Sequence, residues 1–200
     1  MNEKLELIKE ISSSSNPYYG GSVAYLQAGI NLALLSKLSS IKCKSKKETN
    51  KALYSTLKTI SDSLLDESMF LVEEDGNDFA KLKELQQGEE KDAFLMKILD
   101  RNLAYIINLN NLDHYLIQAI SSLKGSIVND YIMIKNSIIA CKENLLSIYN
   151  YEANMLSNIE KRQERLTLTL SAIENSNWKE KYYEKLSWME RKKAAYRFEK

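Results

Sequence analysis

One short stretch near the N-terminus, SSSSNPYYGGSV (residues 12–23), concentrates the helix-breaking residues of a chain that otherwise favours helices. It contains the only proline and two of the six glycines. Backbone N–H groups at a helix N-terminus point outward without partners, and glycines let another group approach them closely. Gly20, Gly21 and Ser22 therefore predict that either a ligand or a facing helix comes close to this helix start.

Two further stretches carry carboxylates. EEDGNDF (73–79) includes Asp75, and GSIVNDYIMI (125–134) places Asn129 and Asp130 at the start of a long helix. Asp130 would either cap that helix or act as a partly buried general acid or base with a raised pKa. The carboxylates of 73–78 have no E-x-x-H pattern beside them, so we expect no metal site there and interpret them as a solvated helix end.

Several common catalytic patterns are missing from the sequence. The GG pair is followed by Ser-Val rather than by the Gly-Lys-Ser/Thr of a phosphate-binding loop. His114 is the only histidine, and we interpret it as a structural residue. Cys43 and Cys141 lie far apart in the chain, which favours a reducing compartment over a disulfide or zinc site.

Helical patterns surround these stretches. After Val23, apolar residues recur close to a 3.6-residue period on one broad face: Val23, Leu26, Ile30, Ala33, Leu34 and Leu38. Small residues in the same segment let a neighbouring helix approach closely: Ala24, Ala28 and Gly29. Further helices are predicted at 51–74, 79–85, 89–106 and 112–123, then an uninterrupted helical pattern from 127 to 174. We predict an all-α, single-domain helical bundle of about seven to eight helices.

The overall charge excludes one broad class of partner. Lys and Arg total 28 against 27 Asp and Glu, so no net field attracts nucleic acid or an anionic membrane. No apolar run reaches the roughly 18 residues that cross a bilayer, and MNEKLELIKE lacks the features of a signal peptide. We therefore expect a cytoplasmic protein.

The C-terminal segment, 176–200, differs from the rest because it is basic and aromatic. Trp178, Tyr182, Leu186 and Met189 lie at spacings of one helical stripe. This pattern favours an amphipathic helix that docks on the bundle or on another subunit, and RNA contact is the alternative.

The order of the three stretches resembles the cyclodeaminase domain of formiminotransferase-cyclodeaminase and the related bacterial methenyltetrahydrofolate cyclohydrolases. That family shows S-x-S-P-x-P-G-G-G-S-V-A-A where this chain has SSSSNPYYGGSVAY, and D-E-D-A-x-A-F where it has EEDGNDF. Its N-P-x-A-V-S-D is matched by the segment that ends in Asn129 and Asp130. The intervals between the motifs also agree, and the resemblance covers about residues 3–155.

This resemblance implies a cyclodeaminase-like helical domain at 1–175, with 176–200 as an extension, assembling into dimers or higher homo-oligomers. It implies a reduced folate as substrate and no metal: the family either expels ammonia from 5-formiminotetrahydrofolate or interconverts methenyl- and 10-formyltetrahydrofolate. Carried over position by position, the proton-transfer group would be Asp130. The folate-binding residues would be Gly20, Gly21, Ser22, Asp75 and Asn129.

The chain departs from the family pattern at the loop and further downstream. Tyr18 and Tyr19 replace a proline and a glycine, while the family's L-L-N-V-R-I-N reads LLSIYNY and brings in Tyr149 and Tyr151. The arginine of the family's L-L-N-V-R-I-N motif could bind an anion through two hydrogen bonds, and the tyrosine that replaces it cannot. The alternative hypothesis is therefore a non-catalytic helical homo-oligomer of the same fold, which binds another small molecule or a protein partner through a cleft remodelled by these tyrosines.

Overall fold

The computed structural model describes residues 11, 13 and 19–174, and the regular elements within them are all helices. Their bounds are α2 (Gly20–Lys44), α3 (Lys51–Glu84), α4 (Glu89–Ser122), α5 (Ile127–Ala153) and α6 (Ile159–Glu174). Tyr18 and the C-terminal segment 176–200 lie outside the described residues.

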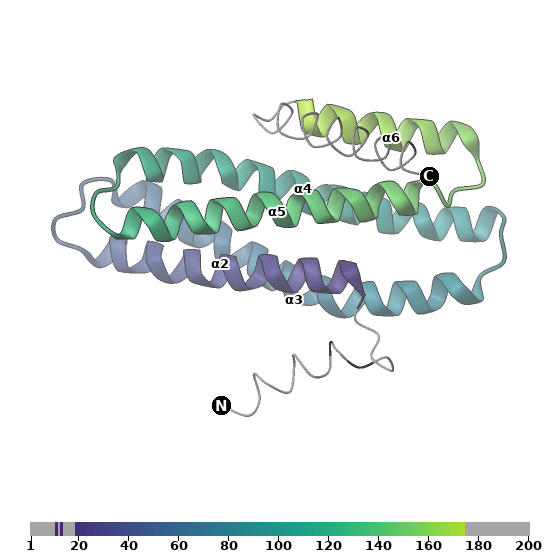
Figure 1. The fold of residues 1–200 in the computed structure, drawn as a ribbon, viewed down its shortest axis with the longest axis horizontal. Helices are drawn as coiled ribbons and strands as arrows, with labels where there is room; N and C mark the ends of the chain where they lie inside the picture. The colour runs from purple at the N-terminus through teal and green to yellow at the C-terminus, as the bar shows by residue number, and fades with distance from the viewer. Residues whose placement is uncertain (1–10, 12, 14–18, 175–200) are drawn as a thin grey trace, which may run out of the picture.

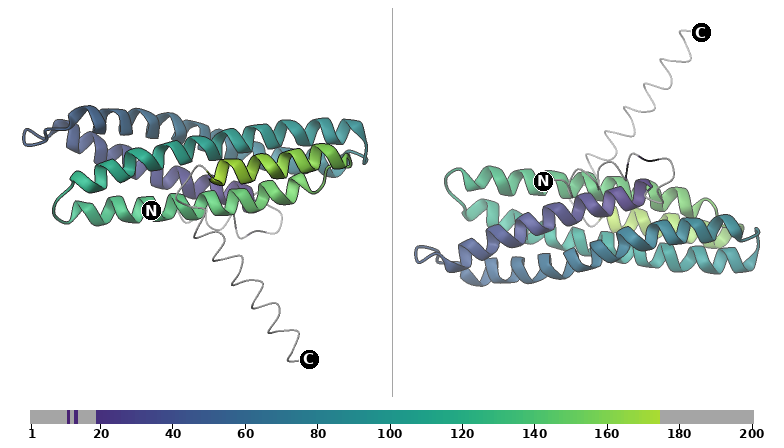
Figure 2. Two further views of the ribbon diagram at one scale, coloured as in Figure 1. Left: turned by 90° about the horizontal axis from the view of Figure 1, so that it is seen from above. Right: turned by 90° about the horizontal axis from the view of Figure 1, so that it is seen from below.

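Helices α2 to α5 run up and down side by side as a four-helix bundle (Figure 1). α2 packs against α3 and α5, α4 packs against the same two helices, and α6 lies on α4 and α5 (Figure 2). The predicted all-α bundle is confirmed. None of the helices in the described ranges is long and apolar enough to span a membrane.

The predicted number of helices is wrong, because the described residues form five rather than seven or eight. DGND does not interrupt α3: Gly76 is buried inside this helix, and the side chains of Asp75 and Asp78 are bound by residues of α2 and α4. A helical glycine costs only about 1 kcal/mol relative to alanine. The contacts made by its neighbours outweigh that cost.

Two further boundaries also differ from the prediction. α4 is continuous where two helices were expected, because Leu109, Leu112 and Leu116 are each fully buried and extend one apolar stripe through the asparagine-rich stretch. Conversely, the pattern predicted to be unbroken from 127 to 174 stops at Ala153 and resumes at Ile159.

A carboxylate from another helix binds the chain at the break before α6. Asp92 of α4 is 3% exposed and accepts hydrogen bonds from the Ser157 backbone N–H (2.9 Å), the Ser157 hydroxyl (2.6 Å) and the Asn158 N–H (3.1 Å). Burial opposes ionisation of Asp92, but these hydrogen bonds outweigh it and lower its pKa. Asp92 therefore holds the two residues that precede α6 on α4, while the helix itself is capped locally by Asn158, whose Oδ1 accepts from the Lys161 N–H at 3.0 Å.

The core contains tyrosines as well as aliphatic residues. The hydroxyls of four fully buried tyrosines each lie within hydrogen-bonding distance of a polar side chain on another helix: Tyr25 with Asn102, Tyr54 with Ser122, Tyr105 with Ser68 and Tyr131 with Ser39. Polar groups buried in this way favour one relative placement of the helices, because any shift leaves them without partners.

The buried face of α2 coincides only in part with the one that the sequence predicted. Leu38 is buried, and Leu26 and Leu34 pack against the core from partly buried positions. The small residues Ala24 and Ala28 are buried too, as the close-packing expectation required. Val23 and Ile30, by contrast, are 38% and 63% exposed. α2 is thus apolar around much of its circumference and leaves an apolar stripe outside the bundle.

Replacing Asp92 with alanine should destabilise the protein by about 1–2 kcal/mol, because the three hydrogen bonds to Ser157 and Asn158, directly before α6, are lost. Urea denaturation would measure the loss, and hydrogen exchange should show faster opening of α6 than of α3. Asp66→Ala removes an exposed carboxylate from α3 and serves as the control. Equal stability of the two variants would contradict the attachment of this segment by Asp92.

Candidate functional site

The first turn of α2 is capped by a side chain from α3. The Ser22 backbone N–H and the Ser22 hydroxyl both donate to Asp75 Oδ2, at 2.7 and 2.8 Å. Tyr19, at the N-cap position of α2, makes no side-chain capping hydrogen bond. Asp75 therefore supplies the negative charge that the exposed amides and dipole of a helix N-terminus favour.

Gly21 makes this cap possible. A Cβ atom at position 21 would lie 2.6 Å from Asp75 Cγ, far inside van der Waals contact, whereas a Cβ at Gly20 would have nothing within 4 Å. The sequence predicted that either a ligand or a facing helix comes close to the glycine loop. In the structure a facing helix, α3, makes this approach through Asp75. The amide of Ser22 is already occupied by a carboxylate of the chain itself.

A cavity of about 190 Å³ opens directly beside this cap. α2 is shorter than α3, with 25 residues against 34. Its first turn lies beside Asp75 rather than at the end of α3, so the bundle has a step at this point (Figure 1). The C-terminal end of α5 forms the opposite wall. The lining combines carboxylates with apolar groups: Tyr19, Gly20, Gly21, Asp75, Asp78, Phe79, Leu82, Ile148, Tyr151, Glu152 and Met155.

Glu152 is the titratable group of this cavity with the most altered acidity. Burial raises its pKa to about 7, and the nearby charge of Asp75 acts in the same direction. A relay of hydrogen bonds holds it: the Tyr25 hydroxyl donates to Asn102 Oδ1 (2.7 Å), and Asn102 Nδ2 donates to Glu152 Oε2 (3.0 Å). Glu152 can therefore take up and release a proton near neutral pH.

Of the three carboxyl residues that line the cavity, Asp78 forms a salt bridge. Arg101 of α4 binds Asp78 and lies 3.6 Å from Glu74. Burial nevertheless raises the pKa of Asp78, an effect that the Arg101 hydrogen bond partly offsets. Within residues 19–174, none of the salt bridges involves Asp75 or Glu152, although the charge of Arg101 acts on Glu152 and partly offsets the rise in its pKa.

Aromatic side chains surround the cavity mouth. The rings of Tyr19 and Phe79 are 4.3 Å apart between centroids, and Lys83 Nζ lies 4.2 Å from the Phe79 centroid. Tyr151 is 67% exposed on the α5 side. Flat aromatic surfaces of this kind can stack on a planar ligand. Tyr149, which the sequence placed with them, is fully buried and donates to the Arg165 carbonyl at 3.5 Å.

The structure brings together four of the six predicted site residues. Gly20, Gly21 and Asp75 line the cavity, and Ser22 binds Asp75. Asn129 and Asp130 are exposed in the first turn of α5, at the opposite end of the bundle. From Asp130 to Glu152 the helix rises about 33 Å at about 1.5 Å per residue. Within one chain, Asp130 does not reach the cavity.

The sequence analysis did not identify Glu152 as a candidate site residue, although the sequence contains a pattern that indicates a buried polar side chain at this position. Leu145, Tyr149 and Glu152 lie at positions i, i+4 and i+7 of one helical stripe, and the first two are buried. Leu95, Leu99 and Asn102 repeat the same spacing on α4. A polar residue that interrupts an apolar stripe indicates a buried polar contact. The carboxylates at 73–78, in turn, lie within α3 rather than at a solvated helix end.

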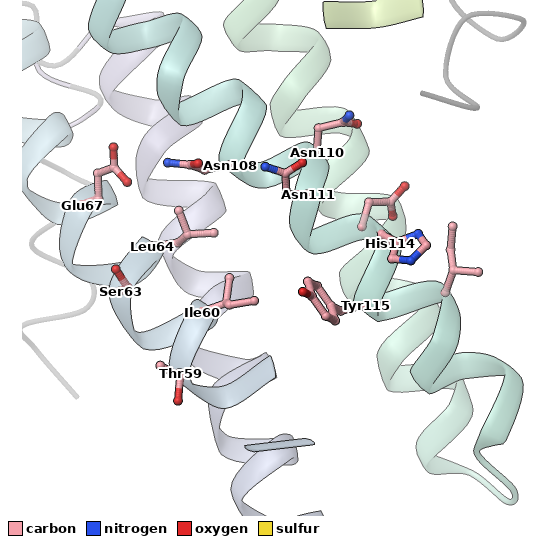
Figure 3. A pocket seen from close by; sticks show the side chains of 12 residues that line it. Thr59, Ile60, Ser63, Leu64, Glu67, Asn108, Asn110, Asn111, His114 and Tyr115 are labelled. Carbon is pink, nitrogen blue, oxygen red and sulfur yellow. The ribbon is translucent and has the colours of Figure 1, made fainter. Parts of the chain in front are cut away.

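A second, larger hollow of about 860 Å³ lies between α3 and α4, and it contains none of the predicted site residues. Thr59, Ser63 and Glu67 of α3 lie across from Asn108 and Asn111 of α4, among other residues (Figure 3). Burial raises the pKa of Glu67, and a hydrogen bond from Asn108 partly offsets the effect.

His114 also borders this second hollow. It is exposed, and its Nε2 lies 2.9 Å from Gln118 Nε2 of the next turn. The hollow is lined by the carboxyls of Glu67 and Asp113, but it contains none of the motif residues and no helix start. We therefore take the smaller cavity as the candidate site.

Neither a metal-binding group nor a known relative identifies the site. Within residues 11, 13 and 19–174, no three His, Cys, Asp or Glu side chains are placed to hold a metal ion. Comparison with known protein families, curated proteins and solved structures finds no match to this chain. The chemistry of the site therefore has to be argued from its own residues.

Substitution of the two loop glycines should have opposite effects. Gly21→Ala should destabilise the protein by about 1–3 kcal/mol, because the new methyl displaces the Asp75 carboxylate and breaks the cap. Gly20→Ala should leave stability unchanged or raise it by up to about 1 kcal/mol, because alanine favours a helix and meets nothing there. Thermal and urea unfolding would compare the two variants. Equal destabilisation of both would contradict the close approach of Asp75.

The pKa of Glu152 predicts that stability falls as the pH rises. Between the usual carboxyl value of 4.5 and about 7, the folded protein keeps a proton that the unfolded chain has released, so the free energy of unfolding decreases across this range. The loss should be on the order of 3 kcal/mol relative to Glu152→Gln, which cannot ionise. Urea denaturation from pH 4.5 to 8 would measure it, with Glu164→Gln as an exposed control. Parallel pH profiles of wild type and Glu152→Gln would show that Glu152 has an ordinary pKa.

Proposed function

We propose that the chain is a folate-dependent one-carbon enzyme, a methenyltetrahydrofolate cyclohydrolase or formiminotetrahydrofolate cyclodeaminase, with Glu152 as its proton-transfer group. The observation that carries this proposal is the position of Glu152: a carboxyl with a pKa of about 7 lines the same cavity as Gly20, Gly21 and Asp75. The motif resemblance points to those three residues, and Glu152 lies outside the motifs.

The charge of the cavity suits the substrates of both reactions. Methenyltetrahydrofolate and protonated 5-formiminotetrahydrofolate each carry one positive charge spread over an N–C–N unit. Asp75 and Glu152 present carboxyls beside apolar walls, where a delocalised cation is attracted and little water competes. The volume of about 190 Å³ admits the reacting end of such a molecule, and Tyr19, Phe79 and Tyr151 offer stacking surfaces at the mouth.

Each reaction needs a group that both accepts and donates a proton. In the cyclohydrolase direction, Glu152 would accept a proton from the water that adds to the methenyl carbon. It would then return that proton to N5 as the carbon–N5 bond breaks, and the remaining hydroxyl proton is released as the formyl group forms. In the cyclodeaminase direction, N10 attacks the formimino carbon, and Glu152 would pass the N10 proton to the departing amine, which leaves as ammonia. A pKa near 7 suits both transfers.

Asp130 has a defined place in this proposal. The motif resemblance assigns it proton transfer, and in a single chain it lies about 33 Å along α5 from Glu152. A role in the reaction therefore requires a second copy that brings its Asp130 to the cavity. The effect of Asp130→Asn distinguishes a site built within one chain from a site shared between two.

The test is turnover of 5,10-methenyltetrahydrofolate and ammonia release from 5-formiminotetrahydrofolate, with wild type and three variants. Glu152→Gln should lower kcat by at least about 100-fold, the usual contribution of a general acid or base. Glu164→Gln should match wild type. Loss of turnover in Asp130→Asn as well would indicate a shared site, and normal turnover would indicate a site within one chain.

Binding provides the second readout. Calorimetric titration with 5-formyltetrahydrofolate, a stable mimic of the substrates, should give micromolar affinity for wild type. Absence of both heat and turnover in a folded wild-type protein would overturn the proposal. It would favour the non-catalytic helical homo-oligomer of the same fold, which binds another small molecule or a protein partner.

A further inference from the structure

Two buried polar side chains outside the cavity hold the carboxyl of Glu152. Tyr25 of α2 and Asn102 of α4 are 1% and 3% exposed, and they are hydrogen-bonded in series to Glu152 of α5. Neither Tyr25 nor Asn102 lines the cavity of about 190 Å³. Any effect of these two residues on a ligand in the cavity therefore has to pass through Glu152.

The hydroxyl of Tyr25 fixes the direction of the hydrogen bonds in this series. It donates to Asn102 Oδ1 at 2.7 Å, and this is its only hydrogen bond to the described residues. If the Asn102 amide were flipped, Nδ2 would face Tyr25 and the buried hydroxyl proton would have no acceptor. Burial and the charges of Asp75 and Glu152 raise the pKa of Tyr25, so the hydroxyl keeps this proton. Asn102 is consequently held with Oδ1 toward Tyr25 and Nδ2 toward Glu152.

The orientation of Asn102 makes the two oxygens of the Glu152 carboxyl different. Oε2 accepts from Asn102 Nδ2 at 3.0 Å, whereas Oε1 accepts no hydrogen bond from residues 19–174. Oε1 is not among the buried polar atoms that lack a partner, so it is the oxygen that a ligand in the cavity can reach. Because an N–H group faces Oε2, the proton of the neutral carboxyl lies on Oε1. A group that passes a proton to a ligand needs the proton on the oxygen that faces the ligand.

Charged groups of α3 and α4 also act on this carboxyl. Burial raises the pKa of Glu152 to about 7, and the charges of Asp75 and Asp78 act in the same direction. The hydrogen bond from Asn102 and the charge of Arg101 act in the opposite direction. The acidity of Glu152 thus depends on whether Asn102 presents an N–H group or a carbonyl oxygen to it.

The other two helices that pack against α5 leave this balance unchanged when Tyr25 is altered. Residues 20–36 of α2 include no charged residue. On α6, Arg162 donates to a backbone carbonyl and Arg165 forms a salt bridge with Asp100. Removing only the hydroxyl of Tyr25 therefore leaves every charge in place and releases the Asn102 amide.

We propose that Tyr25 and Asn102 are positioning residues that keep the exchangeable proton of Glu152 on Oε1, the oxygen that faces the cavity. Tyr25 acts on Glu152 through Asn102. With the amide free to flip, Asn102 Oδ1 would accept a proton carried on Oε2, and that proton would point away from the cavity. Delivery of the proton to a folate rests on the proposed function, whereas its position on the carboxyl does not.

NMR of the side-chain carboxyl carbon, with the signal of Glu152 assigned by its loss in Glu152→Gln, tests this position without substrate. Tyr25→Phe should raise the pKa of Glu152 by about 1, because a flipped Asn102 amide stabilises the protonated carboxyl instead of the ionised one. Tyr54→Phe is the matched control. Tyr54 is also fully buried, its hydroxyl lies 3.3 Å from that of Ser122, and its replacement should leave the titration unchanged. An unchanged titration in folded Tyr25→Phe, or an equal shift in Tyr54→Phe, would overturn the proposal.

Asn102→Leu provides a second variant. It removes the donor to Glu152 and should raise the pKa of Glu152 at least as much as Tyr25→Phe does. Because Tyr25 acts through Asn102, adding Tyr25→Phe to Asn102→Leu should cause no further shift. An unchanged pKa in Asn102→Leu would overturn the proposal, as would additive shifts, which would show that Tyr25 acts on Glu152 by another route.

Kinetics link this positioning to the proposed function. In turnover of 5,10-methenyltetrahydrofolate, Tyr25→Phe should move the acidic limb of the kcat profile to higher pH by the amount seen in the titration. KM should stay unchanged, because Tyr25 does not contact the ligand. A changed KM with an unmoved limb would make Tyr25 a determinant of cavity shape and overturn the proposal. A folded wild type without turnover would overturn the proposed function alone, because the NMR titration decides the position of the proton independently.

Discussion

The contact between the Asp75 carboxylate and the first turn of α2 determines where α2 begins along α3. Gly21 permits the contact because a side chain at that position would overlap the carboxylate. α2 therefore starts partway along its neighbour, and the cavity occupies the space beyond its first turn. The same carboxylate adds a negative charge beside Glu152 and helps to raise its pKa. One helix cap thus determines both the shape and the electrostatics of the candidate site.

Buried hydroxyls and amides maintain this arrangement. A bundle of aliphatic residues alone tolerates small sliding movements of its helices, whereas a buried polar pair is lost when either partner moves. Tyr25 and Asn102 connect α2, α4 and Glu152 of α5, so the pair that aligns the three helices also orients the carboxyl. Burial and the charges of Asp75 and Glu152 raise the pKa of Tyr25 well above its usual value, so it remains a hydrogen-bond donor.

The motif residues divide into two groups at opposite ends of the bundle. Gly20, Gly21, Ser22 and Asp75 meet at one end, as the sequence order suggested, and Asp130 lies at the other end of α5.

The local sequence was sufficient to predict the all-helical class and the breaks between helices near 45–50, 86–88 and 123–126. It also predicted that another group comes close to the backbone at the glycine loop. Gly88 and Gly125, the two described glycines with positive φ, lie in the last two of these breaks. Three features depended on partners distant in sequence: the continuity of α3 through Gly76, the attachment of Ser157 and Asn158 to α4 by Asp92, and the pKa of Glu152. Propensities differ by about 1 kcal/mol per residue, and one buried contact from another helix is enough to override them. Only the tertiary structure determines which contacts those are.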